Sequence, residues 1–180
     1  MKTDLIALAK SFGFTNAEWI DASQIICDRK FREQCAVNAC GVYGKCWMCP
    51  PDIGEIDELI AQVKSYSRGL MYQSVFELED SFDFEGMMDA GANHNALSRR
   101  ITTELAAEPF AQRMHLGAGG CRLCQRCARI TNEPCRDPEH SMSSLETYGI
   151  AVSTLAAACG MNYINGANTV TYFGAYFVQL

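Results

Sequence analysis

Residues 117–138 read GAGGCRLCQRCARITNEPCRDP and carry cysteines at positions 121, 124, 127 and 135. The first three, Cys121, Cys124 and Cys127, follow the spacing C-x2-C-x2-C. This spacing wraps a short loop around one point, and it opens the ferredoxin-type run that holds a cubane iron–sulfur cluster. The glycines before the run allow backbone amides to approach the sulfurs closely. Cys135 stands further along than the strict ending C-x3-C-P requires, so the fourth position departs from the ferredoxin pattern.

Three kinds of chemistry are open to these thiols. An iron–sulfur cluster is the first prediction, because three cysteines on one loop suit a cubane. Zinc also binds four thiolates, but it usually takes two separated C-x2-C knuckles. Disulfides or inert thiols are the third possibility. The spacing therefore predicts a metal site and favours iron–sulfur over zinc.

Another cysteine group lies upstream in CAVNACGVYGKCWMCPP, residues 35–51. This earlier group consists of Cys35, Cys40, Cys46 and Cys49, and the group at residues 121–135 is the later group. The glycines and the final prolines of the earlier group predict a loop rather than a helix. A cysteine followed by proline, as at Cys49, also ends a ferredoxin run, and in two-cluster ferredoxins that cysteine serves the other cluster. Cys49 could therefore complete the later group, with Cys135 crossing the other way, and the sequence leaves this pairing open.

Composition limits the class of protein. The chain has 180 residues, ten cysteines and a formal net charge of -6, which argues against general nucleic-acid binding. An early acidic residue and Lys10 make the N-terminus unlike a secretory signal. No run of apolar residues is long enough to span a membrane. We therefore expect a cytoplasmic protein, in which metal ligation is the better explanation of the cysteines than disulfides. We expect Cys27 and Cys159 to serve packing only.

The final segment, TVTYFGAYFVQL at residues 169–180, is apolar at both odd and even positions and predicts a strand buried on both faces. Two further strands are expected at residues 70–78 and 112–116. The fold predicted is α+β, a small mixed or antiparallel sheet packed with helices, with two cysteine-rich metal-binding loops. We expect one iron–sulfur domain over residues 1–180.

Helices are expected from residues 52–66, from 84–107 with a break at Gly91, and from 150–159 with an end at Gly160. A first helix should begin after Thr3 or Asp4 and end at Gly13. The spacing of Ser143 and Glu146 predicts a capping box that opens another short helix. Residues 17–31 fit either a strand or a helix.

Two polar features have bland and functional interpretations. His94, His115 and His140 share no ligand spacing and are expected to be structural or surface histidines. The acidic turn within residues 77–85 is expected to be a solvated loop, and its alternative is a docking patch for a basic partner.

Together the two cysteine groups resemble a prokaryotic family of predicted metal-binding proteins, domain of unknown function 2284. The resemblance rests on C-x4-C-G-x-Y-G-K-x-W-x-C-P-P and on G-x-C-x2-C-x2-C-A, P-C-R-x-P and S-x-E-x-Y-G-I. The matching residues are Cys35, Cys40, Gly41, Tyr43, Gly44, Lys45, Trp47, Cys49, Pro50, Pro51, Gly120, Cys121, Cys124, Cys127, Ala128, Pro134, Cys135, Arg136, Pro138, Ser143, Glu146, Tyr148, Gly149 and Ile150. The resemblance implies metal binding in an anaerobe-type cytoplasm and supplies no reaction.

The same resemblance bears on Cys46, whose position often holds serine or another small residue in that family. The resemblance therefore implies three dependable ligands in the earlier group, namely Cys35, Cys40 and Cys49. A cubane held by three cysteines leaves one iron open to another ligand. In this chain Cys46 is either the fourth ligand of that cluster or a cysteine that does not bind it.

Three functions follow from these observations. The first is a redox or electron-transfer accessory protein with two 4Fe-4S clusters and a redox protein partner. In it, four arginines surround one cluster and raise its potential, and a solvated loop with ordinary salt bridges is the alternative for them. These arginines are Arg122, Arg126, Arg129 and Arg136.

The second function is an enzyme that uses an open-iron cluster for small-molecule or sulfur chemistry. Its candidate acids and bases are Glu146, His94, Tyr43 and Lys45, and Cys46 could act as a thiolate. The third is a zinc-stabilised interaction module. The redox function is our first prediction, and the oligomeric state stays open.

Overall fold

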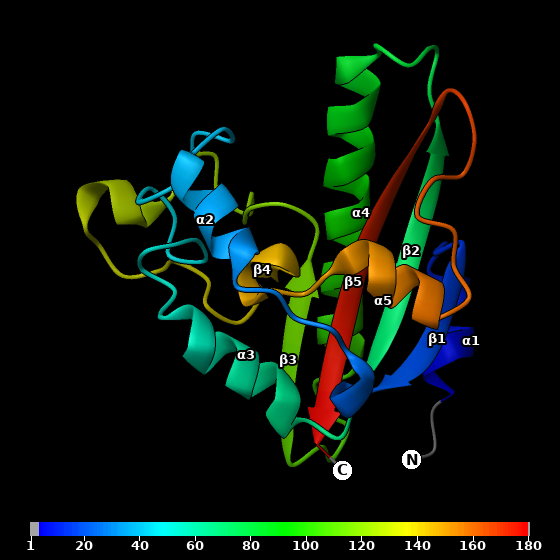
Figure 1. Cartoon of the computed structure of the whole chain (residues 1–180), viewed down its shortest axis with the longest axis horizontal. Coiled ribbons are helices and arrows are strands. Elements are labelled where there is room, and N and C mark those ends of the chain that lie inside the picture. Colours follow the sequence, from blue (N-terminus) through cyan, green and yellow to red (C-terminus); the bar gives the residue numbers. More distant parts are fainter. Residues whose placement is uncertain (1–3, 180) are drawn as a thin grey trace.

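Strand β5 (Thr169–Gln179) runs through the middle of the sheet, as its apolar sequence predicts. The computed structural model describes residues 4–179, and Figure 1 shows its elements. The strand order is β1-β2-β5-β3-β4. The other strands are β1 (Asn16–Asp21), β2 (Arg68–Glu77), β3 (Gln112–Gly117) and β4 (Ser143–Ser144). The strands expected at residues 70–78 and 112–116 are confirmed.

The sheet is mixed. β5 pairs antiparallel with β2 from Arg68↔Val178 to Glu77↔Thr169, and antiparallel with β3 on its other side. β3 and β4 are parallel and pair only at Leu116↔Ser143 and Gly117↔Ser144. The ambiguous residues 17–31 form strand β1, a 3-10 helix η1 (Ala22–Gln24) and the start of helix α2. The α+β prediction is confirmed.

Helices cover both faces of the sheet (Figure 1). The helices are α1 (Leu5–Ser11), α2 (Lys30–Val37), α3 (Ile56–Ser65), α4 (Phe84–Glu104) and α5 (Val152–Ala158), with 3-10 helices η2 (Ala128–Thr131) and η3 (Glu146–Tyr148). On one face α1 and α4 pack against Leu70, Tyr72 and Tyr176, and on the other α3 and α5 pack against Met71 and Phe177. Alternate residues of each strand therefore serve opposite cores. Within residues 4–179, none of the helices combines the length and hydrophobicity required to cross a membrane.

The helix ends follow local chemistry. Asp4 caps α1, since its carboxylate accepts hydrogen bonds from the amides of Ile6 and Ala7. The alternative cap, Thr3, lies outside the described residues. Helix α5 ends before Gly160, whose φ is +66°, as predicted. The predicted capping box is wrong, because Ser143 belongs to β4 and Ser144 instead accepts from the amide of Thr147.

Helix α4 differs from its prediction in two ways. It continues through Gly91, whose missing side chain allows the Tyr172 ring to pack closely; a Cβ there would lie 3.1 Å from Tyr172 Cζ. Its apolar residues Met87, Met88, Leu97, Ile101 and Leu105 predict an apolar buried face, but Met88 is 53% exposed whereas His94 is fully buried. The sheet below presents polar groups, and His94 Nδ1 lies 2.9 Å from Ser74 Oγ.

A second histidine, His115, is held in the same polar layer. Its Nε2 lies 2.6 Å from the Tyr72 hydroxyl and its Nδ1 lies 2.7 Å from Thr102 Oγ1. Burial lowers the pKa of His94 to about 4, and burial together with the nearby charges of His94 and Arg99 lowers the pKa of His115 to about 3. Both rings are therefore neutral structural elements, in agreement with the expectation from sequence.

These histidines should make the protein acid-sensitive. Their pKa values in the fold lie below the unfolded value of about 6.5, so the unfolded chain binds more protons at lower pH. The free energy of unfolding is fully present above pH of about 6.5 and falls as the pH drops toward 4. His94 alone should cost about 3 kcal/mol at pH 4. Urea unfolding from pH 7 to pH 4 measures the slope. It should be shallower in His94→Asn and unchanged in His140→Gln, and equal slopes for all three proteins would contradict the prediction.

Candidate metal centre

The two cysteine-bearing segments meet at one end of the molecule. Figure 1 shows α2, residues 38–55 and residues 118–142 gathered beyond the β3–β4 edge of the sheet. The indole Nε1 of Trp47 donates to the carbonyl of Glu133 at 2.8 Å. Ser143 Oγ donates to the carbonyl of Met48 at 2.7 Å. These bonds fasten the earlier cysteine segment to the C-terminal part of the later one and to strand β4, which follows it.

An ion pair strengthens this contact. Arg129 Nε lies 2.7 Å from Asp52 Oδ2, and the guanidinium stands 5.1 Å from the centre of the Trp47 ring. The redox function predicts that the four arginines of this segment surround a cluster, and the alternative is a solvated loop with ordinary salt bridges. Arg129 instead ties the segments together, and Arg136 lies 3.7 Å from Glu133 while donating to the Arg126 carbonyl.

The later cysteines surround one small cavity. The cavity has a volume of about 20 Å³, and Trp47, Met48 and Leu123 form part of its wall. The cysteines that line it are Cys46, Cys121, Cys124, Cys127 and Cys135. The structure thus brings Cys135 to the same cavity as the C-x2-C-x2-C run, together with one cysteine of the earlier group.

Cys35, Cys40 and Cys49 form the other group. Cys35 lies on helix α2, so the expectation of a loop throughout residues 35–51 is wrong at its start. Burial raises the pKa of Cys35, and Cys40 and Glu146 are close enough to raise it further. Cys35 and Cys40 also act on the pKa of Cys49, behind the larger effects of Cys46 and burial. These three thiols therefore share one neighbourhood.

Cys46 lies close to cysteines of both groups. The Cys121 thiol lowers the pKa of Cys46, but the contact with Cys49 and burial outweigh this effect and raise it to about 12. The contact with Cys46 also raises the pKa of Cys121, and burial adds to it. The pKa of Cys49 is lowered because the Cys46 thiol lies against it. Cys46 therefore lies close to Cys49 of its own group and to Cys121 of the later group, with which it lines one cavity.

The glycine loop before Cys121 passes close to the earlier cysteine group. A Cβ on Gly120 would lie 3.5 Å from Cys49 Sγ. The loop is held from α4 by Asn95, whose Nδ2 donates to the carbonyl of Ala118 at 3.1 Å and whose Oδ1 accepts from its amide at 3.3 Å. A Cβ on Gly117 would come within 2.9 Å of that Oδ1. Glycine is needed at position 117 for this clamp.

The thiols are gathered without forming a ready site for one ion. Among residues 4–179, no three His, Cys, Asp or Glu side chains lie close enough to hold a single metal ion. All ten cysteines are free thiols. The backbone of Cys27 forms an isolated β-bridge with Ile150, and its side chain packs against the core. Cys159 is the C-cap residue of α5. Both cysteines therefore lie apart from the two groups.

A family comparison bears on this geometry. The family model described as "Predicted metal-binding protein (DUF2284)" matches residues 18–178. The chain belongs to this family. The match includes every cysteine of both groups, so the resemblance seen in the sequence motifs is confirmed. As a member of this metal-binding family, the chain has a metal as its expected cofactor. Separate searches found no curated protein and no solved structure that matches the chain.

The proposed acids and bases of this family member are dispersed. His94 lies on the buried face of α4, whereas Glu146 lies near Cys35. Lys45 is exposed beside Cys46, and Tyr43 is partly buried, its amide donating to Asn38 Oδ1. Sequence reasoning missed Asn95, because a helical asparagine carries no local signal of the distant loop that it binds.

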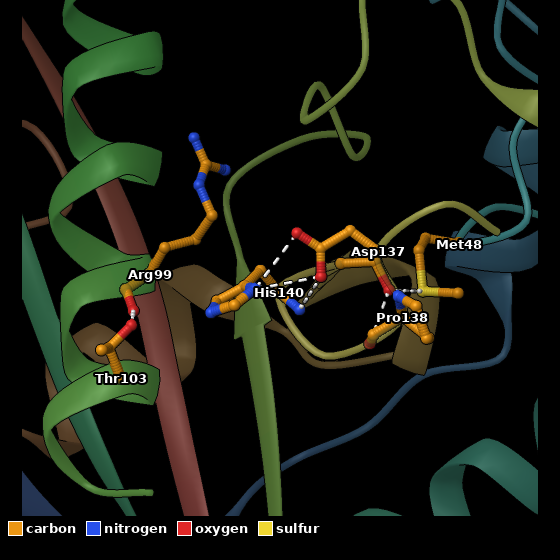
Figure 2. A network of polar contacts seen from close by, with 7 residues as sticks. Met48, Arg99, Thr103, Asp137, Pro138 and His140 are labelled. Carbon is orange, nitrogen blue, oxygen red and sulfur yellow. Dashed lines mark hydrogen bonds and ion pairs between the residues drawn. The ribbon is translucent and has the colours of Figure 1, made fainter.

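An open cleft of about 380 Å³ adjoins the cysteine end. Met48 and Ser141 line both this cleft and the cysteine cavity. Figure 2 shows Asp137, Pro138 and His140 between the Met48 segment and helix α4, which carries Arg99. His140 Nδ1 lies 3.0 Å from Asp137 Oδ1, and this contact lowers the pKa of Asp137. This contact spans Pro138 and Glu139, which line the cleft.

Proposed function

We propose that this chain is a cytoplasmic redox protein that holds two 4Fe-4S clusters in its two cysteine groups. The observation that carries the proposal is that Cys46, from the earlier group, lines the same cavity as Cys121, Cys124, Cys127 and Cys135. It means that two groups from distant parts of the chain stand side by side. Two adjacent redox centres can exchange electrons directly, which a storage or transfer protein requires. The free state of all ten cysteines supports a reducing compartment.

The residues fit such clusters by number and by chemistry. Cys121, Cys124, Cys127 and Cys135 would hold one cluster, because they line a common cavity. The remaining group would hold the other, with Cys46 as its fourth ligand. Its members are Cys35, Cys40, Cys46 and Cys49. Soft thiolates without carboxylate or imidazole partners suit iron–sulfur centres. When bound, such clusters accept and release single electrons.

Zinc is supported less well. The sulfurs of one tetrahedral zinc site stand about 3.8 Å apart, since each Zn–S bond is about 2.3 Å. No three side chains in residues 4–179 have the spacing of a single-ion site. A cubane is wider and needs thiols that are gathered but more separated. The apolar wall formed by Trp47, Met48 and Leu123 would shield it from water.

Metal analysis of protein purified without oxygen tests the proposal. We expect about eight irons and eight sulfides per chain, visible absorption and a cubane signal in the EPR spectrum after reduction. Zinc without sulfide or colour would overturn the redox function and leave the interaction module.

A second candidate function is an enzyme whose substrate enters the cleft of about 380 Å³. The observation in its favour is that Met48 and Ser141 join the cleft to the cysteine cavity. Such an enzyme needs a three-cysteine cluster with one open iron, and Cys46 as a bystander. Cys46→Ser separates the two functions. Unchanged iron content and EPR spectrum would favour the enzyme, whereas loss of one cluster would favour two closed redox sites.

A further inference from the structure

A shallow depression opens over the cysteines on the outer surface. Its volume is about 360 Å³, and Cys46, Cys121, Cys124 and Cys127 line it. It therefore lies on the outer side of the same thiols that surround the small cavity. Any cluster held by the later group would be close to this surface.

The rim of the depression is cationic. Lys45, Arg122 and Arg126 line it, and no carboxylate does. Within the part of the chain that the structure describes, these three side chains make no ion pair, whereas the neighbouring Arg129 and Arg136 do. The formal net charge of the whole chain is -6, so this local excess of positive charge runs against the overall balance.

The same surface has an apolar centre. Ile130 is 44% exposed and lines the depression together with Val42. A small apolar patch inside a charged rim is the anatomy of a transient protein interface. The depression is open rather than enclosed, which suits a protein surface better than a small anion.

Negative charge is concentrated elsewhere. Four acidic residues lie close together at the start of α4. The turn before the helix carries Glu79, Asp80 and Asp83, and the first turn of the helix carries Glu85. Figure 1 places this turn at the upper end of α4, apart from the cysteine loops. The molecule therefore has a positive cysteine end and a negative turn. This separation would orient an approaching acidic protein toward the cysteines.

We propose that the depression is the docking face for an acidic electron-carrier protein. The inference rests on the proposed redox function and adds the partner and its place of contact. In the exchange, one electron passes from the reduced carrier to the oxidised cluster, and no bond forms or breaks. Attraction between the cationic rim and carboxylates on the carrier speeds the encounter, and Ile130 supplies apolar contact.

The test uses metal-loaded protein and an acidic 2Fe-2S ferredoxin as the probe. Calorimetry measures binding, and stopped-flow absorption measures electron transfer from the reduced ferredoxin. We expect the rate to fall at least about tenfold between about 10 mM and about 300 mM salt, because surface charges are screened. Basic cytochrome c should bind at least about tenfold more weakly than the ferredoxin at low salt.

Two matched double variants locate the face. Arg122→Gln with Arg126→Gln should weaken ferredoxin binding about tenfold and flatten the salt dependence. Lys10→Gln with Arg100→Gln removes the same charge from α1 and from α4, where Arg100 stacks 4.4 Å from the Phe12 ring, and should leave binding unchanged. If the first double variant loses iron, the single change Lys45→Gln replaces it, with about threefold weaker binding expected.

The outcomes separate the two proposals. Equal binding by both double variants, or equal binding of ferredoxin and cytochrome c, overturns the docking face. Binding of citrate without binding of ferredoxin also overturns it and makes the depression a small-anion site. Normal reduction by dithionite without ferredoxin binding rejects the docking face alone. A wild-type sample with no reducible cluster rejects the redox function, whatever calorimetry shows.

Discussion

Replacing Cys124 with serine should remove about half of the iron and sulfide from protein purified without oxygen, leaving about four irons per chain. Cys124 lines the small cavity with three other cysteines of its own segment. A serine hydroxyl is a poor ligand for iron in a cluster, because it is harder and less readily deprotonated than a thiol. Elemental analysis and the visible spectrum measure the loss. The EPR spectrum of the reduced variant should retain only the signal of the other cluster.

The matched control is Cys159→Ser. Cys159 is partly buried against the core and lies outside both groups, so this variant should keep its full iron content. If Cys124→Ser keeps all of its iron, the later group, to which Cys124 belongs, does not hold a cluster. If both variants lose metal equally, the loss comes from general destabilisation.

Replacing Gly174 with alanine should lower the free energy of unfolding by about 3 kcal/mol. Gly174 lies in the central strand β5, directly opposite Tyr72 of β2. A Cβ at this position would overlap the Tyr72 ring, which is fully buried and held by its contact with His115. The ring cannot move without breaking that contact, so the strain must be taken up by the two strands.

Urea denaturation measures this cost. Ser153→Ala, on the exposed side of α5, serves as the control and should change the free energy of unfolding by less than about 0.5 kcal/mol. A Gly174→Ala protein as stable as the wild type would show that Tyr72 has room to shift. A large loss of stability would show that the close pairing of β2 with β5 does not accommodate a side chain at position 174.

The central strand and most helices could be predicted because their signals are local. The run of apolar residues in β5 allows only burial on both faces, and Asp4 and Gly160 mark helix ends by their own chemistry. Helix α4 misled the prediction, because its core-facing side carries His94 opposite Ser74. Such pairing depends on a distant strand and leaves no periodic apolar signal.

The candidate site was predictable in composition but not in arrangement. The spacing of the cysteines indicated two groups, and both groups exist as neighbourhoods in the fold. The position of Cys46 between them could not be read from spacing, since it depends on how two segments pack together. The place of Cys135 in the cavity also depends on the bond between Trp47 and Glu133, which joins residues far apart in the chain.

The amide clamp of Asn95 has a consequence for how the molecule moves. Both hydrogen bonds of the clamp end on Ala118, three residues before Cys121, so a displacement of the glycine loop pulls directly on the middle of α4. Helix α4 therefore connects the cysteine end to the sheet. When a metal binds at the cysteines and fixes the loop, the backbone amides of α4 should exchange hydrogen for deuterium more slowly.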